Sequence, residues 1–292
     1  MKMTFKILFI ISFLMNFSPL IAKKNYSFDE LINIYLNAKD TIRSYNFINC
    51  SYGISNLFFD NKLREKFSNS YISKIEYGFC RYRTFDDFKI ISHSSEFAYL
   101  ENVSSHFKPK MIGKGKLTVD GWNFGFGLNN GYGYVISNSF FLLLEHISAI
   151  NWNRIDFEVL SNDTNLRLLQ KKYDEKYKFG YLFSTGISFK ANNQIILGTE
   201  YTHNIVFNNV TTKEFVKMLL FDNLFQFWIE LLDPILREKY REYYPLVKFL
   251  YKNSISITLW QLRKTNESFP FGNHKIPLNI NKLSINISYI FE

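Results

Sequence analysis

The last residues of the chain alternate between apolar and polar side chains. From Leu283 to Phe291 every odd position is large and apolar, while the even positions are small or polar except for Ile290. Side chains of a β-strand point to opposite faces with a period of two, so this segment predicts a strand with one apolar and one polar face. Strands of a membrane-spanning barrel have this composition, because one face meets lipid and the other meets the lumen.

The same period governs residues 177–207. Odd positions up to Phe189 are large and apolar except for Thr185, the even ones are polar or glycine except for Leu182, and residues 191–193 have the composition of a turn. Each arm is about 14 residues long, which exceeds the usual globular strand of about 5–6 residues and is sufficient for a tilted membrane strand. We expect Phe179, Tyr181 and Phe183 to face lipid, and Lys178, Gly180 and Ser184 to face the lumen.

Weaker alternation predicts further strands at 75–80, 88–100, 114–128, 132–134 and 255–259. Asn129-Asn130-Gly131 has the composition of a tight hairpin turn. The predicted fold is therefore an all-β membrane protein, with an antiparallel transmembrane β-barrel over residues 70–292. We expect about ten strands, since bacterial barrels have an even number.

Two segments have helical patterns. Residues 27–39 begin with Ser27-Phe28-Asp29-Glu30, a capping box, and predict a short helix within an N-terminal helical or irregular segment, 23–69. Residues 211–251 carry apolar residues at helical spacing, interrupted by Pro234 and Pro245. This helical insert is expected either to lie on the membrane surface or to occupy the barrel.

The N-terminus has the layout of a secretory signal peptide. Lys2 and Lys6 lie around the start of an apolar run over residues 7–15, and Ala22 ends a stretch suited to cleavage. The run is much shorter than the roughly 20 residues that a membrane anchor needs. We therefore predict cleavage after residue 22, export, insertion into the outer membrane by the barrel assembly machinery, and contact with outer-membrane lipid.

Composition narrows the partners. The 292 residues carry a net charge of +9, aromatic residues make up 18%, and the mean hydropathy is only −0.13. A basic chain favours anionic partners, and export argues against nucleic acid. Cys50 and Cys80 form either one disulfide or two free thiols. The five histidines are scattered without metal-ligand spacing, so we predict no metal and no cofactor.

Lysines on the polar face of the predicted strands are the candidate functional set. Lys178 and Lys190 have this position in the hairpin predicted over residues 177–207. Glu200 lies on the polar face of the return strand of that hairpin. Lys74, Lys114, Lys116 and Lys282 have similar positions. Lysines facing a lumen would form a cationic pore that concentrates anions. The alternative is that they lie at strand ends and contact only headgroups or water.

One constellation supports an enzyme hypothesis. His146 and Ser148 are two residues apart and share a strand face, with Glu145 and Glu158 near in sequence. This pair resembles the outer-membrane lipid A deacylases, a likeness that would make Ser148 the nucleophile, His146 the base and Glu158 the orienting acid. The match covers two residues, and we expect the chain not to be an enzyme.

The signal peptide without a lipobox, a mature chain near 270 residues, the basic charge and the terminal strand together resemble spirochaetal outer-membrane porins of the dicarboxylate-specific type. That resemblance implies passage of small anionic metabolites. The predicted function is a porin-like channel for small anionic solutes. The alternatives are a structural or adhesive outer-membrane barrel without an open pore, and the lipid esterase. The sequence leaves the oligomeric state open.

Overall fold

A computed structural model gives the architecture of the protein. The structure describes residues 42–59, 69–85, 89–105, 117–137, 140–159, 164–173, 176–192, 194–208, 210–265 and 277–291. The predicted signal peptide 1–22 and the predicted helix 27–39 lie outside these residues, as do Lys114 and Lys116.

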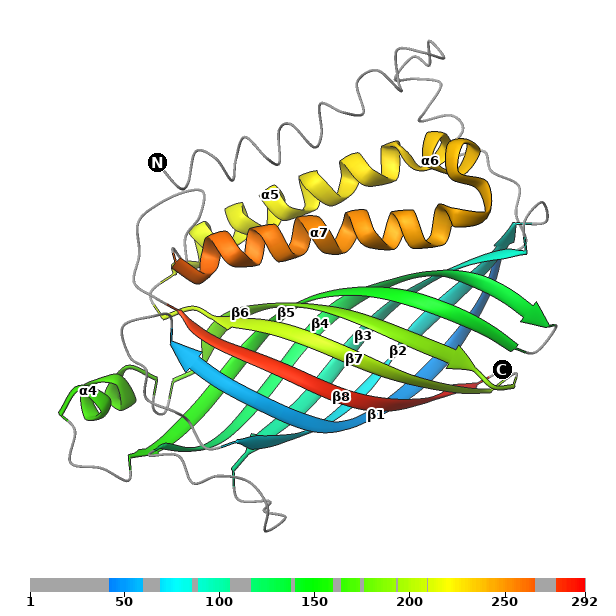
Figure 1. Cartoon of the computed structure of the whole chain (residues 1–292). Helices are drawn as coiled ribbons and strands as arrows, with labels where there is room; N and C mark the ends of the chain where they lie inside the picture. The colour runs from blue at the N-terminus through cyan, green and yellow to red at the C-terminus, as the bar shows by residue number, and fades with distance from the viewer. Residues whose placement is uncertain are drawn as a thin grey trace.

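Eight strands form a closed antiparallel barrel, in which each strand pairs with its neighbours in sequence and the last pairs with the first (Figure 1). The strands are β1 (Ile42–Phe59), β2 (Ser70–Phe85), β3 (Ile90–Ser104), β4 (Leu117–Ser137), β5 (Phe140–Val159), β6 (Lys178–Lys190), β7 (Ile195–Val206) and β8 (Leu278–Phe291). The predicted closed antiparallel barrel is confirmed. The predicted count of about ten strands is wrong.

Two errors contribute to the overcount. Residues 255–259 were expected to form a strand, but they lie within a long helix. The predicted turn at Asn129-Asn130-Gly131 lies inside β4, which continues through it without a break. Asn129 points into the barrel and donates a hydrogen bond to Glu145, and Gly131 leaves room for the His93 side chain. Asn129 and Gly131, which favour turns, therefore contribute here to packing inside the lumen.

The barrel also begins earlier than predicted. β1 starts at Ile42, inside the segment 23–69 that was expected to be helical or irregular. Its inward face mixes Asn49, Ser51 and Ser55 with Leu57, and its outward face includes the small Cys50. The period of two is therefore weak in hydropathy, although the strand pairs with both neighbours.

The helical insert lies between β7 and β8. It contains α5 (Thr212–Leu231), α6 (Asp233–Tyr240), the short helix η1 (Arg241–Tyr243) and α7 (Tyr244–Thr265). A separate helix, α4 (Thr164–Tyr173), follows β5. Thr211 and Glu214 form the capping box that begins α5, and Pro234 occupies the first turn of α6. The insert begins as predicted but extends to Thr265, not to residue 251. No helix in the described part of the chain is both long enough and apolar enough to cross a membrane.

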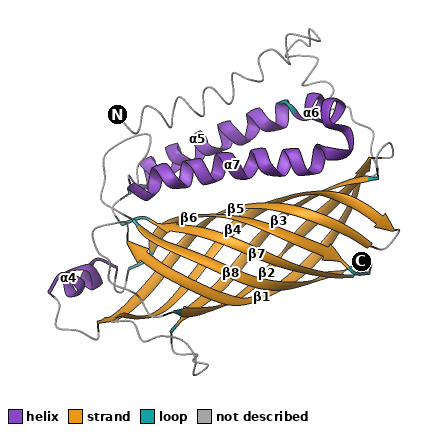
Figure 2. Ribbon diagram, in the orientation of Figure 1, coloured by secondary structure: helices purple, strands orange, loops and turns teal. Residues whose placement is uncertain are grey.

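The insert does not occupy the barrel. α5 and α7 run side by side along the outer wall of the barrel, and α7 packs against β4 and β5 (Figure 2). We call α5, α6, η1 and α7 the helical hairpin. Its charged residues face one another: Asp222 on α5 binds Arg263 on α7 through two hydrogen bonds of 2.7 Å or less. Glu230 accepts from Lys248 at 2.8 Å and from Lys252 at 2.6 Å.

The predicted strand faces have the right parity. Ser184 points into the lumen and donates a hydrogen bond to Glu200, while Phe183 points outward. However, Phe183 is only 1% exposed, because Phe215, Met218 and Trp260 of the helical hairpin cover it. Phe179 stacks on Phe215 in the same way. The outward face of β6 therefore meets helix at these positions, not lipid.

The two cysteines are both free thiols. Cys50 on β1 is exposed on the outer wall, whereas Cys80 on β2 is buried inside the barrel. They lie on adjacent strands, but Cys50 is opposite Ile75 and Cys80 is opposite Tyr45. Because the two side chains point to opposite faces of the sheet, the disulfide alternative is excluded.

Candidate functional site

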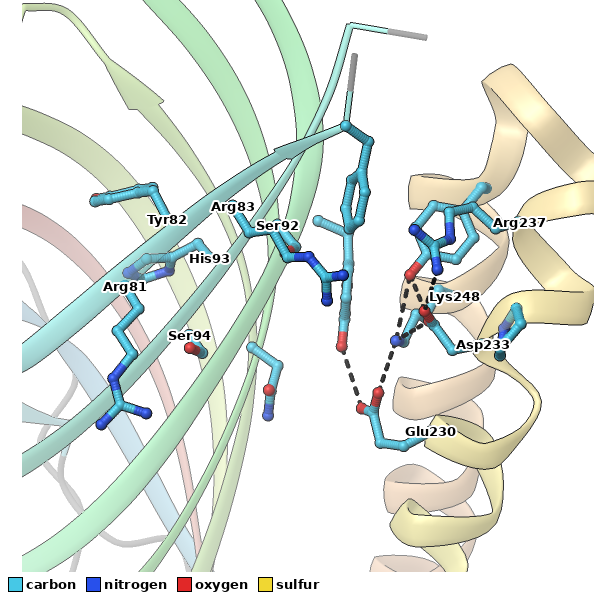
Figure 3. Close-up of a pocket in the computed structure, with 15 residues that line it drawn as sticks. Arg81, Tyr82, Arg83, Ser92, His93, Ser94, Glu230, Asp233, Arg237 and Lys248 are labelled. Atoms are coloured by element: carbon cyan, nitrogen blue, oxygen red, sulfur yellow. Dashed lines mark hydrogen bonds and ion pairs between the residues drawn. The ribbon is translucent and has the colours of Figure 1, made fainter. Parts of the chain in front are cut away.

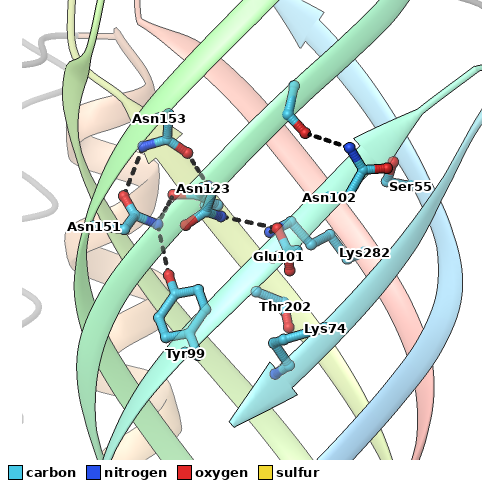
Figure 4. Close-up of polar contacts among 12 residues, drawn as sticks. Ser55, Lys74, Tyr99, Glu101, Asn102, Asn123, Asn151, Asn153, Thr202 and Lys282 are labelled. Atoms are coloured by element: carbon cyan, nitrogen blue, oxygen red, sulfur yellow. Dashed lines mark hydrogen bonds and ion pairs between the residues drawn. The ribbon is translucent and has the colours of Figure 1, made fainter.

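The middle of the lumen is filled by a network of polar side chains (Figure 4). Lys74 on β2 lies 2.8 Å from Glu76 and 3.1 Å from Glu200 on β7, across the barrel. Glu200 also accepts hydrogen bonds from Ser184 and Thr202. One barrel wall is thus joined to the opposite one through a buried ion pair.

A second set of contacts runs beside the first. Lys282 on β8 forms an ion pair with Glu101 on β3, which also accepts from Asn123 at 2.8 Å. Asn151 donates to the Tyr99 hydroxyl at 3.0 Å and to Asn204 at 3.1 Å. Nearer the other end, Glu145 accepts from Asn129 at 2.8 Å and from Ser188. These bonds leave little of the lumen's polar surface free for a passing solute.

The lumenal charges do not form a cationic ring. The buried, inward-facing charged residues of the described strands are Lys74, Lys190, Lys282, Glu76, Glu101, Glu145 and Glu200. Four are carboxylates and three are lysines, so the interior carries no excess of positive charge from these side chains. An anion entering it would meet Lys74 and Lys282 already paired with carboxylates.

Apolar side chains close the network on either side. One cluster contains Leu57, Ile72, Val119 and Phe157 from the strands together with Tyr173 of α4. The other contains Phe47, Tyr82, Phe141, Ile196 and Ile290 among its members. A cavity of about 40 Å³ lies between the polar network and the second cluster, and its lining includes Glu76, His93 and Glu145. Such a space holds on the order of one or two waters.

The predicted pore lysines have different positions. Lys190 is buried inside the barrel, with its ammonium group 4.9 Å from the ring centres of both Tyr82 and Phe141. Lys178 is half-buried at the start of β6 and donates to the Asn208 carbonyl at 3.1 Å. The structure brings Lys74 and Glu200 together but places neither Lys178 nor Lys190 with them.

Sequence reasoning did not identify Glu76, Glu101 and Glu145 as lumenal residues. A signal was present, because Lys74 and Glu76 share the parity of one strand and therefore face the same side. Equal attention to acidic residues at that parity would have predicted a neutralised interior. The cross-barrel partners follow only from the strand register.

The esterase constellation is not assembled. His146 points outward, where its ring nitrogens lie 3.1 Å from Asn253 and 3.4 Å from Ser256 of α7. Glu158 lies twelve residues further along β5, roughly 40 Å away at the usual rise of a strand. Glu145 points into the lumen. His146 is only 1% exposed, so the hairpin covers the position where a substrate would have to bind.

A larger cavity lies outside the barrel, between its wall and the helical hairpin (Figure 3). Its volume is about 250 Å³. We call it the side cavity. It is lined by Arg81, Tyr82, Arg83, Phe85, Ser92, His93, Ser94, Asn130, Tyr132, Glu230, Asp233, Pro234, Arg237, Tyr244 and Lys248. Among the described residues, no group of three or more His, Cys, Asp or Glu side chains could hold a metal ion.

Neither a protein family nor a curated protein sequence matches the chain. Solved structures with some likeness include Neisserial surface protein A (NspA), at 9% identity and a TM-score of 0.39, with 85% of this chain and 99% of that one covered. Ail, the attachment invasion locus protein of Yersinia pestis, has 9% identity, a TM-score of 0.31 and the same coverage. The outer membrane protein OprG from Pseudomonas aeruginosa has 12% identity and a TM-score of 0.25, with 85% and 96% covered. These scores are too low to carry an argument, so the barrel assignment rests on its own strand pairing.

Proposed function

We propose that the protein is a bacterial outer-membrane barrel with a sealed lumen, which serves as a structural platform in the membrane and not as a conduit. The observation that carries this proposal is the interior: a paired polar network lies between two apolar clusters. An eight-stranded barrel has an interior just wide enough for side chains to fill. This is the pore-free alternative considered from the sequence, and the lumen supports it better than an anion channel.

The outer wall supports a position in lipid. Its exposed residues on β1, β2, β4 and β8 are mostly large and apolar, as lipid-facing strand residues are. They include Tyr52, Ile54, Ile75, Tyr77, Phe79, Trp122, Phe124, Phe126, Leu128, Leu283, Ile285 and Ile287. Every strand has at least twelve residues, more than the roughly 9–11 that a tilted membrane strand needs. Such a wall would be poorly soluble in water.

The helical hairpin extends this apolar wall. Val216, Leu220 and Leu224 are spaced by four residues, so they form one stripe on α5, and all are about half exposed or more. Leu250 and Ile257 continue the apolar surface on α7. The central charges of the hairpin are paired on its inner side, as described above. Its outer face therefore suits the same lipid layer as the strands that it leaves uncovered.

The lengths of the connections give an orientation. Residues 86–89, 138–139 and 191–194 join strands at one end, which we call the short-turn end; the connections at the other end are much longer. Bacterial barrels have short periplasmic turns and longer extracellular loops. The short-turn end then faces the periplasm, consistent with a signal peptide and with assembly from the periplasmic side.

Conductance in a planar lipid bilayer tests the proposal. We expect no discrete conductance steps from purified protein whose insertion is confirmed by flotation with vesicles and by a mobility shift between unheated and heated gel samples. A general porin treated identically serves as the positive control. Discrete steps with anion preference, lost in a Lys74→Ala/Lys282→Ala variant, would overturn the sealed lumen and support the anion channel.

A further inference from the structure

A row of polar side chains crosses the outer wall of the barrel on β2, β3 and β4. Arg81 and Arg83 on β2 point outward, and their cross-strand neighbours on β3 are Ser94 and Ser92. Asn130 on β4 continues the row beside Ser94. Further along the same outward face of β2, Phe79 and Tyr77 are more than half exposed. Polar side chains here follow an apolar stretch of the same strand face.

The helical hairpin lies over this row of polar side chains and leaves the side cavity between them. α6 and the ends of α5 and α7 face β2, β3 and β4 across the side cavity (Figure 3). Its volume of about 250 Å³ equals that of about eight waters in the liquid. A group larger than a single ion or water therefore fits between the barrel wall and α6.

The charges lining the side cavity favour an anion. Its cations are Arg81, Arg83, Arg237 and Lys248, and its acids are Glu230 and Asp233. Lys248 contacts both acids, and Lys252 contacts Glu230. Arg237 lies 3.8 Å from Asp233, and Arg81 lies 3.7 Å from the exposed Glu96. The four lining cations outnumber the two lining acids, so the side cavity carries an excess of positive charge.

Phe85 holds two of the arginines close together. The guanidinium of Arg83 lies 4.9 Å from the centre of the Phe85 ring, and that of Arg237 lies 4.5 Å from it. Two like charges near one ring repel each other, and an anion that contacts both offsets that repulsion. A planar guanidinium with several donors matches the oxygens of a phosphate group particularly well.

The position of the side cavity along the barrel axis indicates which phosphate compound would reach it. Arg83 is two residues from the end of β2 at the short-turn end. Two residues span about 7 Å of strand, similar to the thickness of the headgroup layer outside the hydrocarbon core. A membrane that surrounds the barrel would thus place its phosphate groups at the level of the side cavity, with Phe79 and Leu100 exposed toward the acyl chains.

We propose that the side cavity binds the phosphate of a phospholipid headgroup, held by Arg83 and Arg237 with the hydroxyls of Ser92 and Ser94. The acyl chains of this lipid lie along the outer wall of β2 and β3. This inference rests on the proposed position in a membrane, and it adds a specific lipid site that joins the helical hairpin to the barrel.

Native mass spectrometry of the full chain, released from vesicles of phosphatidylglycerol, tests the site. We expect one retained phosphatidylglycerol per chain, and at least about tenfold less retention in the Arg83→Gln/Arg237→Gln variant, because each charge-assisted bond to a phosphate is a strong one. Arg83→Lys keeps the positive charge but loses the paired N–H donors of the guanidinium, so this variant should retain an intermediate amount of phosphatidylglycerol. Arg154→Gln is the matched control, since Arg154 also points outward but lies exposed beside Asp156 on β5.

Each other outcome has a defined meaning. The phosphate site would be overturned if the double variant retained as much phosphatidylglycerol as the wild type. It would also be overturned if the wild type retained diacylglycerol, which lacks the phosphate, equally well. Binding of inorganic phosphate without any retained lipid would assign a free anion and overturn the lipid. Flotation of the same samples separates the two proposals: a wild-type chain that floats with vesicles but retains no lipid contradicts only this inference. If it does not float, the membrane position itself is contradicted.

Discussion

Individual side chains inside this barrel depend strongly on their partners. Lys282 and Glu101 are each only 1% exposed and form an ion pair with each other. A buried charge that loses its partner is costly, because neither water nor another charge replaces the lost interaction. The lumen therefore tolerates paired changes better than single ones.

Replacing Lys282 with Met should lower the free energy of unfolding by about 3–5 kcal/mol, because Glu101 would keep its charge without a cation. The measurement is a urea titration in detergent micelles, with the folded fraction read from unheated gel samples. The double variant Lys282→Met/Glu101→Gln should regain most of the loss. Arg154→Gln removes an exposed pair and should change stability by less than about 1 kcal/mol. Equal effects of the Lys282 and Arg154 single variants would show that the lumen pair is not stabilising.

Gly127 makes space for an aromatic ring. A Cβ atom at this position would lie 2.4 Å from the Phe97 ring and 3.0 Å from the Ala149 Cβ. Gly127→Val should therefore destabilise the barrel by about 1–3 kcal/mol through overpacking. Adding Phe97→Leu to this variant should recover part of the loss in the same urea titration. If Gly127→Val leaves the midpoint unchanged, the lumen has more free space than the packing indicates.

At the scale of elements, the helical hairpin and the barrel hold together by different interactions. The strands form a closed ladder of hydrogen bonds that includes no residue of the hairpin. The hairpin relies on the Asp222–Arg263 pair and on apolar packing of Phe215, Met218 and Trp260 against the wall. The two parts can therefore respond separately to a substitution.

Arg263→Met should loosen the hairpin while the barrel stays closed, because Asp222 would lose a partner that is itself fully buried. Limited proteolysis in vesicles should cut within residues 211–265 at least about tenfold faster than in the wild type, a ratio that corresponds to about 1.4 kcal/mol. The gel shift of the barrel should persist. Loss of both together would show that hairpin and barrel unfold as one unit.

Spin labels test whether the outer side of the hairpin faces lipid, as proposed. In a Cys50→Ser/Cys80→Ser background, labels at Leu224 and at Ile285 should both collide with oxygen more than with a water-soluble nickel complex, since both residues are exposed on the proposed lipid-facing surface. A label at Lys213, exposed near the start of α5, is the aqueous control. Preferential collision with nickel at Leu224 but not at Ile285 would place the hairpin outside the lipid.

The molecule as a whole is a barrel to which the hairpin adds an outer layer. β7 and β8 are paired where the insert leaves and returns, with Val206 opposite Leu278. Replacing residues 211–265 by a short Gly-Ser linker should therefore leave a closed barrel with a gel shift and lower stability. It should still conduct no ions, because no residue of the hairpin belongs to the lumenal clusters. Conductance that appears only after the deletion would assign the sealing to the hairpin.

The sequence predicted a closed antiparallel barrel, the β6–β7 hairpin and the start of the helical insert. It did not predict the number of strands. Ile255, Ile257 and Leu259 alternate with polar residues over five positions, which is too short a stretch to separate a strand from one turn of an amphipathic helix. β1 was missed for a different reason. Polar residues of β1 fill the lumen and its outward residues are not uniformly apolar, so its alternation in hydropathy is weak.

The direction of the β6 side chains was determined by the sequence alone, because alternation along a strand is a local property of the backbone. Ser184 inward and Phe183 outward followed from it. What those side chains contact was decided only by the tertiary structure. Phe183 meets the hairpin and Lys74 meets Glu200 through strand register and packing between segments far apart in the chain. A sealed, paired interior differs from a cationic pore only in these long-range contacts, which no local period encodes.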